Sequence, residues 1–239
     1  MKRSRKRKSR KTLNRNNRKD VLKVKKVISV LMAMMLVVLG VTACGSKKDE
    51  KSPEATPEAM QKQEEKKSDD VYAKKIGFTI EMEDGGVMKG ELYPDVAPIT
   101  VDNFVKLAES KFYDGLIFHR VIPGFMIQGG GFDKDLNPKE AESIKGEFST
   151  NGVENPLKHT RGVISMARTS VPDSASSQFF IMHEDYPSLD GQYAAFGKVT
   201  EGLDIIDAIA SVETTTVPEK GMQDVPKEAC VIKTITIPK

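Results

Sequence analysis

From residue 76 onward, apolar residues occur in short runs that are separated by turn-forming residues. Residues 76–82 and 87–93 flank the turn sequence Glu83-Asp84-Gly85-Gly86, a pattern typical of a β-hairpin. Further strand-like runs lie at residues 116–121, 125–128, 162–167, 178–182, 194–199 and 231–237. Because the strands are many and short, the pattern predicts an antiparallel barrel or sandwich.

Two segments have helical periodicity instead. The first begins at Thr100, a candidate N-cap. Its apolar residues share one helix face: Val101, Phe104, Val105 and Ala108. The second has an apolar face formed by Leu203, Ile206, Ile209 and Ala210. Residues 132–160 have little periodicity, and we expect a surface loop that crosses near a site.

The composition excludes several classes of protein. A hydrophobic fraction of 38% with 30% charged residues, and a mean hydropathy of −0.39, excludes a polytopic membrane protein. The two cysteines, Cys44 and Cys230, are too few for a disulfide framework or a structural zinc site. The three histidines match no metal-ligand spacing, so we expect no metal, and we expect Cys230 to be a buried, unreactive thiol.

The formal net charge of +3 conceals a strong asymmetry. Residues 1–43 hold 14 Lys or Arg and one acid, a net +13, so the rest of the chain carries −10. Basic residues 2–19 have the composition of a nucleic-acid arm. Positive charge ahead of an export segment already has an explanation in membrane orientation, so no nucleic-acid partner is expected.

Residues 27–43 are uncharged and apolar and are followed by Cys44. A run of 17 residues leaves a plain membrane anchor as the alternative to a cleaved signal. The sequence Val41-Thr42-Ala43-Cys44 resembles the lipobox of bacterial lipoproteins, which implies that residues 1–43 are a signal peptide and that Cys44 carries lipid. We therefore expect a lipid-anchored protein on the outer face of the cell membrane. A translation start near Val21 or Leu22 is a further hypothesis, because residues 1–43 are long for a signal.

Residues 44–75 are rich in Lys, Glu, Ser and Pro and predict a disordered tether. A flexible chain of about 30 residues has a root-mean-square reach of about 30 Å. Residues 76–239 then form the one globular domain, which we expect to be a monomer.

The most distinctive segment is Phe118-His119-Arg120-Val121-Ile122-Pro123-Gly124-Phe125-Met126-Ile127-Gln128-Gly129-Gly130. Two strands joined by a Pro-Gly turn carry Arg120 and Gln128 beside Phe125 and Met126. Because side chains alternate along a strand, Met126 and Gln128 share a face. A guanidinium next to apolar side chains predicts a binding site.

This segment resembles the signature of the cyclophilin family of peptidyl-prolyl isomerases. Three later segments agree with that family in order and spacing: residues 162–167, 177–181 and 189–199. The resemblance spans about residues 76–238. It implies a closed eight-stranded antiparallel barrel capped by two α-helices. It also implies isomerisation of X-Pro bonds in proline-containing polypeptides, without a metal or organic cofactor.

By position, the resemblance implies a catalytic group formed by Arg120, Phe125 and Gln128. It implies that the peptide is bound by Met126, Ala167, Arg168, Gln178, Phe180, Leu189 and Tyr193. Two positions depart from the common family pattern. Ser188 replaces a frequent tryptophan, which weighs against tight cyclosporin binding, and Arg168 replaces a frequent asparagine.

A proline-motif binding chaperone or surface binding module is the alternative function. Arg120 argues against it, because a binder has no need of a donor that acts in the transition state. A hydrolase is not favoured, because Ser176 and Ser177 lie in no Gly-x-Ser-x-Gly motif.

Overall fold

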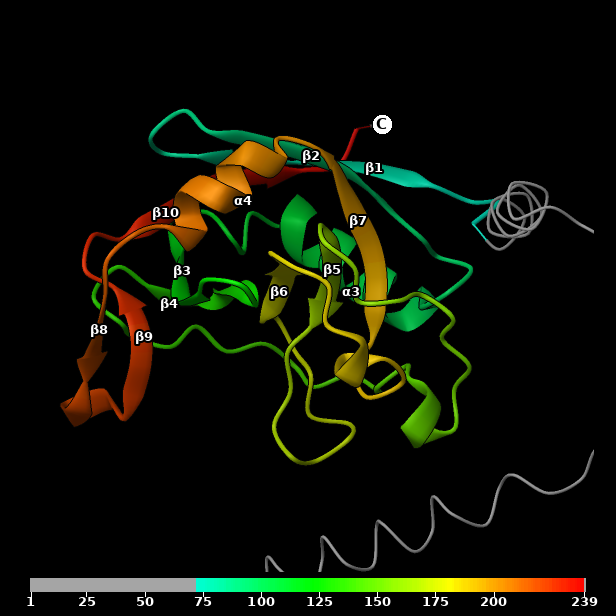
Figure 1. The fold of residues 1–239 in the computed structure, drawn as a ribbon. Coiled ribbons are helices and arrows are strands. Elements are labelled where there is room, and N and C mark those ends of the chain that lie inside the picture. The colour runs from blue at the N-terminus through cyan, green and yellow to red at the C-terminus, as the bar shows by residue number, and fades with distance from the viewer. Residues whose placement is uncertain (1–71, 239) are drawn as a thin grey trace, which may run out of the picture. The chain divides into compact units, whose positions relative to one another are not determined.

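The computed structural model describes residues 72–238 (Figure 1). The predicted signal peptide, Cys44 and all but the last residues of the predicted tether lie outside the described residues. The structure therefore does not test those predictions.

Eight strands form a closed barrel in which every neighbouring pair is antiparallel (Figure 1). In spatial order they are β1 (Ile76–Met82), β10 (Cys230–Thr236), β3 (Leu116–Ile122), β4 (Met126–Asp133), β6 (Phe179–Met182), β5 (Val163–Met166), β7 (Ala195–Glu201) and β2 (Val87–Leu92). A closed barrel leaves no strand edge unpaired. The predicted fold class is confirmed.

The predicted hairpin at the start of the domain is confirmed as β1 and β2. Thr79 pairs with Lys89 and Ile80 with Met88 across it. The backbone N–H of Gly86 donates to the carboxylate of Asp84 at 2.9 Å, an Asx turn that closes the hairpin.

Two α-helices contribute apolar faces to the barrel core: α3 (Pro98–Glu109) and α4 (Leu203–Ala210). Phe104 of α3 lies at the centre of an aromatic cluster, with ring centroids 5.3–6.1 Å from those of Phe78, Tyr113, Phe179 and Phe196. Neither helix in residues 72–238 is long and apolar enough to cross a bilayer.

The prediction that Thr100 caps the first helix is wrong. The helix begins at Pro98, whose ring fixes φ at a helical value, and the N-cap residue Ala97 has no capping side chain. Glu147 supplies the cap from a distant segment: its carboxylate accepts from the backbone N–H groups of Ile99 and Thr100 and from the Thr100 hydroxyl, at 2.7–3.1 Å.

Residues 132–160 were expected to form a surface loop, but part of this segment belongs to the core. Phe148 and Leu157, which lie before and after the short 3₁₀ helix η1 (Ser149–Asn151), are buried in the hydrophobic cluster. The side-chain amide of buried Asn155 donates to the backbone carbonyls of Glu147 and Ala195, both at 2.9 Å. These bonds fasten the segment to β7, which explains how a long stretch without periodicity stays ordered.

A second hairpin was not predicted. β8 (Thr214–Val217) and β9 (Met222–Pro226) form a separate two-stranded sheet joined by the 3₁₀ helix η3 (Pro218–Lys220) (Figure 1). β8 is rich in Thr, and prolines stand in the turn (Pro218) and at the end of β9 (Pro226). The segment therefore lacks the apolar alternation that identified the barrel strands.

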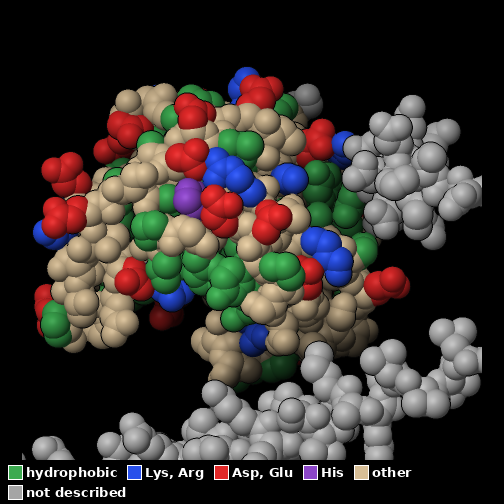
Figure 2. All heavy atoms as spheres, in the orientation of Figure 1, with side chains coloured by type: hydrophobic (Ala, Val, Ile, Leu, Met, Phe, Trp, Pro, Cys, Tyr) green, Lys and Arg blue, Asp and Glu red, His purple; other side chains and the backbone are tan. Residues whose placement is uncertain are grey.

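The face of the domain shown in Figure 2 carries acidic and basic side chains interspersed, around a central group of hydrophobic side chains. Several of the domain's surface charges form exposed ion pairs, such as Lys89 with Glu201 and Lys106 with Asp102. Pairs of this kind contribute little to stability.

Replacing Glu147 by alanine tests the distant cap. The variant leaves two backbone donors and a buried hydroxyl without their acceptor, so we expect the free energy of unfolding to fall by about 3 kcal/mol. Urea unfolding measures this loss. Asp102→Ala removes an exposed carboxylate of α3 and serves as the control, with an expected change of about 0.5 kcal/mol or less. Equal losses in the two variants would contradict the capping role.

Candidate active site

The site is built on β3, β4 and the turn between them. Arg120 on β3 lies directly opposite Gln128 on β4, and Ile122 lies opposite Met126. Between Phe118 and Arg120, β3 advances by two residues while β4 advances by one, which is a β-bulge. A bulge changes the direction of the side chains that follow it, and here it leaves Arg120 half-buried at the surface next to a buried neighbour.

The turn that carries Phe125 is held by His183. Gly124 has φ +74°, a left-handed conformation that glycine adopts without strain. The Gly124 N–H donates to Nδ1 of His183 at 2.9 Å, and the His183 N–H donates to the Phe125 carbonyl at 2.9 Å. Nε2 of His183 lies 3.2 Å from the carboxylate of Asp207 on α4. The position of Phe125 is therefore set by His183, which directly follows β6, and by α4 as well as by its own hairpin.

These elements enclose a pocket of about 120 Å³. Nine of the ten residues that the sequence assigned to the site line it: Arg120, Phe125, Met126, Gln128, Ala167, Arg168, Phe180, Leu189 and Tyr193. They come from β3, β4 and the turn between them, from β6, from the 3₁₀ helix η2 (Pro187–Leu189) and from two loops. The pocket combines the apolar side chains of Phe125, Met126, Phe180 and Leu189 with the guanidinium groups of Arg120 and Arg168 and the amide of Gln128.

Gln178, the tenth predicted residue, lies behind this pocket. Its side-chain oxygen accepts a hydrogen bond from the amide of Gln128 at 3.0 Å. The side chain fits there because Gly131 has no Cβ: a Cβ at that position would lie 2.4 Å from Cγ of Gln178. Gln178 therefore orients Gln128 and lines a neighbouring pocket instead.

Arg168 forms part of the wall through its side chain. Its guanidinium lies 4.7 Å from the ring centroid of Tyr193 and 4.8 Å from that of Phe148, a double cation–π contact. It also donates to the carbonyl of Gln192 at 2.8 and 3.1 Å. These contacts give the Arg168 side chain a role within the wall.

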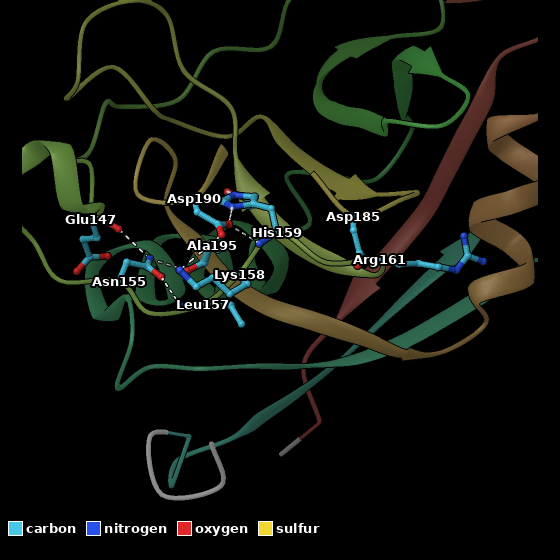
Figure 3. A network of polar contacts seen from close by, with 10 residues as sticks. Glu147, Asn155, Leu157, Lys158, His159, Arg161, Asp185, Asp190 and Ala195 are labelled. Carbon is cyan, nitrogen blue, oxygen red and sulfur yellow. Dashed lines mark hydrogen bonds and ion pairs between the residues drawn. The ribbon is translucent and has the colours of Figure 1, made fainter. Parts of the chain in front are cut away.

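A polar network that includes His159 and Asp190 (Figure 3) lies against Phe180, and sequence analysis missed it. Nδ1 of His159 lies 3.1 Å from the carboxylate of Asp190, and Nε2 lies 3.1 Å from the hydroxyl of Ser165. The His159 ring stacks against Phe180 at 6.0 Å, and Tyr193 meets Phe180 edge-on at 5.7 Å. The only signal in the sequence was Asp190 in the Leu-Asp-Gly segment.

This Ser-His-Asp arrangement is structural. Ser165 is fully buried, so its hydroxyl has no access to a substrate. Burial lowers the pKa of His159, partly offset by Asp190, and favours a neutral ring. Burial alone would raise the pKa of Asp190, but hydrogen bonds from His159 lower it.

His119 occupies the bulge next to Arg120 and is buried, with its ring 4.7 Å from that of Phe132. Burial lowers its pKa to about 4, and the positive charge of Arg120 adds to this effect. Nδ1 of His119 is a buried atom without a hydrogen-bond partner in the described part of the chain.

Among residues 72–238, no three or more His, Cys, Asp or Glu side chains lie close enough together to bind a metal ion. Cys230 is half-buried, not fully buried as predicted. Burial still raises the pKa of its thiol to about 11, which disfavours the reactive thiolate.

A closed eight-stranded barrel with two helices, and a guanidinium beside an apolar pocket, defines a cyclophilin-like protein. The family model for cyclophilin-type peptidyl-prolyl cis-trans isomerases matches residues 77–237. The chain belongs to this family, and it is a peptidyl-prolyl cis-trans isomerase.

Similar proteins agree with this assignment. A peptidyl-prolyl cis-trans isomerase of Acinetobacter baylyi is 48% identical over 159 residues, covering 64% of this chain and 80% of the relative. Peptidyl-prolyl cis-trans isomerase B of Escherichia coli is 43% identical over 155 residues, covering 61% of this chain and 90% of the relative. A crystal structure of a Cryptosporidium parvum cyclophilin is 28% identical and aligns with a TM-score of 0.58, covering 70% of this chain and 99% of that one.

The low pKa of His119 predicts a loss of stability in mild acid. The ordinary value is 6.5 and the folded value about 4, so the unfolded state binds this proton first. Stability is therefore complete above pH 6.5 and falls as the pH drops towards 4, by about 3 kcal/mol from this group.

Unfolding in urea across this pH range checks the prediction. His119→Gln removes the titration, so its stability should fall less steeply than that of the wild type. Parallel curves for the two proteins would contradict it. His159 titrates in both and cancels in the comparison.

Proposed function

We propose that the enzyme accelerates X-Pro isomerisation through a hydrogen bond from Arg120 to the prolyl nitrogen. The proposal rests on one observation: the half-buried guanidinium of Arg120 lies at the margin of the pocket lined by Phe125, Met126 and Phe180. The apolar side chains bind the proline ring, and the guanidinium faces the amide that must rotate.

The physical basis is the loss of amide resonance. Rotation about an X-Pro bond has a barrier of about 18–20 kcal/mol, because the twisted bond loses its double-bond character. The twisted nitrogen regains a lone pair, which accepts a hydrogen bond better than the planar amide does. A donor fixed in advance therefore stabilises the transition state more than the ground state.

The other polar groups of the site serve orientation. Gln128 is held by Gln178 and can bond the peptide backbone next to the proline. The Phe180 ring is fixed between His159 and Tyr193, so the floor of the pocket does not shift as the bond rotates. No proton transfer or nucleophile is required.

Substitution of Arg120 in the full-length chain tests this mechanism. We expect Arg120→Ala to lower kcat/KM for a proline tetrapeptide by about 10²-fold, the usual effect of removing one transition-state donor. Arg120→Lys keeps the charge but loses the planar fork, and we expect intermediate activity. Cis-to-trans relaxation of the peptide measures the rate, and circular dichroism controls for folding.

Two outcomes would overturn the proposal. A folded Arg120→Ala variant with wild-type turnover would remove Arg120 from the mechanism. A folded wild type with no acceleration would favour the proline-binding module.

We further propose that the substrates are exported polypeptides and that the enzyme is held at the outer face of the cell membrane by lipid on Cys44. The uncharged residues 27–43, the basic residues before them and the small residues preceding Cys44 support this location. Uncatalysed isomerisation takes tens to hundreds of seconds, so exported chains with prolines fold slowly without a catalyst. A tether of about 30 residues allows the domain to work near the membrane without resting on it.

Replacing Cys44 by serine tests the anchor. We expect the wild type to incorporate labelled palmitate and to fractionate with membranes, because the lipid supplies the hydrophobic attachment. The Cys44→Ser variant should incorporate none. Cys230→Ser, which changes the other cysteine, is the matched control and should be labelled as the wild type is. Labelling of the Cys44→Ser variant would contradict lipidation at this residue.

A further inference from the structure

We propose that Asp224, on the β8–β9 hairpin, is a positioning residue that orients the guanidinium of Arg120. This inference rests on the proposed role of Arg120 in isomerisation. It assigns a function to a hairpin that lies outside the barrel and that the barrel does not need for closure.

The first observation is a long ion pair. Nε of Arg120 lies 3.8 Å from a carboxylate oxygen of Asp224, and both side chains are about two-fifths exposed. This distance exceeds that of a hydrogen bond, so the contact is a charge interaction that consumes no donor. The carboxylate faces the inner nitrogen of the guanidinium, which leaves both terminal amino groups for a substrate.

Comparison with the other arginines in residues 72–238 shows how unusual this is. Arg161 donates to both carboxylate oxygens of Asp207 and to two backbone carbonyls, and Arg168 donates to backbone carbonyls of Thr169 and Gln192. Those side chains are fixed, but their donors are occupied. Within the described chain, Arg120 is instead oriented by charge attraction alone. Its guanidinium is therefore held in position while its N–H donors stay free to bind a substrate.

The second observation is the backbone of Asp224. Its φ is +58°, a left-handed conformation that is uncommon outside glycine and that Asp and Asn tolerate best. Such conformations persist where the surrounding structure enforces them, often at functional sites. Here β9 packs against β3, so the hairpin brings Asp224 close to the strand that carries Arg120.

The third observation is the space around the guanidinium. A second pocket of about 390 Å³ lies between the barrel and the hairpin, and Arg120 lines both this pocket and the proline pocket. Asp224 lines the second pocket together with His119, Phe132 and Gln178. A long side chain between two open spaces has several rotamers available. The carboxylate restricts these rotamers by its attraction for Nε.

The test compares Asp224→Asn with Glu219→Gln in the full-length chain. Both variants remove one negative charge from the same hairpin, but Glu219 lies in η3 and forms no ion pair with Arg120 within the described residues. Asn keeps the size of Asp and tolerates the left-handed backbone. We expect Asp224→Asn to lower kcat about fivefold with KM within about twofold of the wild type, the scale of one exposed ion pair. Glu219→Gln should behave as the wild type.

Ionic strength provides a readout that a purely structural role would not move. Salt screens an exposed pair, so about 1 M salt should reduce the wild-type kcat towards that of Asp224→Asn and leave the variant nearly unchanged. If Asp224→Asn folds poorly, Asp224→Gly is the second variant, because glycine adopts the left-handed conformation of residue 224 without strain. It also lacks the carboxylate, so it should show the same loss of kcat.

Each outcome has a separate meaning. An active wild type with an unchanged Asp224→Asn variant, an effect on KM alone, or an equal effect of Glu219→Gln would overturn the positioning role and leave the proposed function standing. A folded wild type without turnover would overturn the proposed function and this inference together.

Discussion

The site depends on the hydrogen-bond register across β3, β4, β6 and β5. Arg120 lies opposite Gln128, Gln128 opposite Phe180, and Phe180 opposite Ser165. Directly opposed residues in antiparallel strands project from the same face about 5 Å apart, so these four residues form one row across four strands. A shift of one residue in any pairing would move its side chains to the other face. Closure of the barrel prevents such a shift, because each strand is paired on both sides.

Polar side chains from outside the barrel strands also hold the site residues in place. His159 supports Phe180, His183 holds the turn of Phe125, and Asn155 fastens the long segment 132–160 to β7. Each anchor is a side chain bonded to groups far away in the sequence. An isomerase needs this rigidity, since its advantage lies in groups that are already placed when the amide twists.

Periodicity predicted the barrel strands and both helices, because it reflects which local face is buried. It failed where the local pattern did not decide the structure. Thr100 has a side chain suited to an N-cap, but the helix begins two residues earlier, at Pro98. The carboxylate of Glu147 accepts the hydrogen bonds of the first helical N–H groups instead. The β8–β9 hairpin has no alternating apolar face, because it packs at the margin of the barrel and contributes little to the core.

The many short strands of the sequence indicated a barrel or sandwich, and its resemblance to the cyclophilin family implied the closed barrel and the residues that gather at the pocket. The segment from Phe118 to Gly130 by itself places a donor and apolar groups on two strands joined by one turn. The tertiary structure alone decided which distant groups contact these residues. Asp224 reaches Arg120, and His159 reaches Phe180, only after distant segments pair or pack in the closed barrel. Such contacts depend on three-dimensional packing, which no local pattern of residue types encodes.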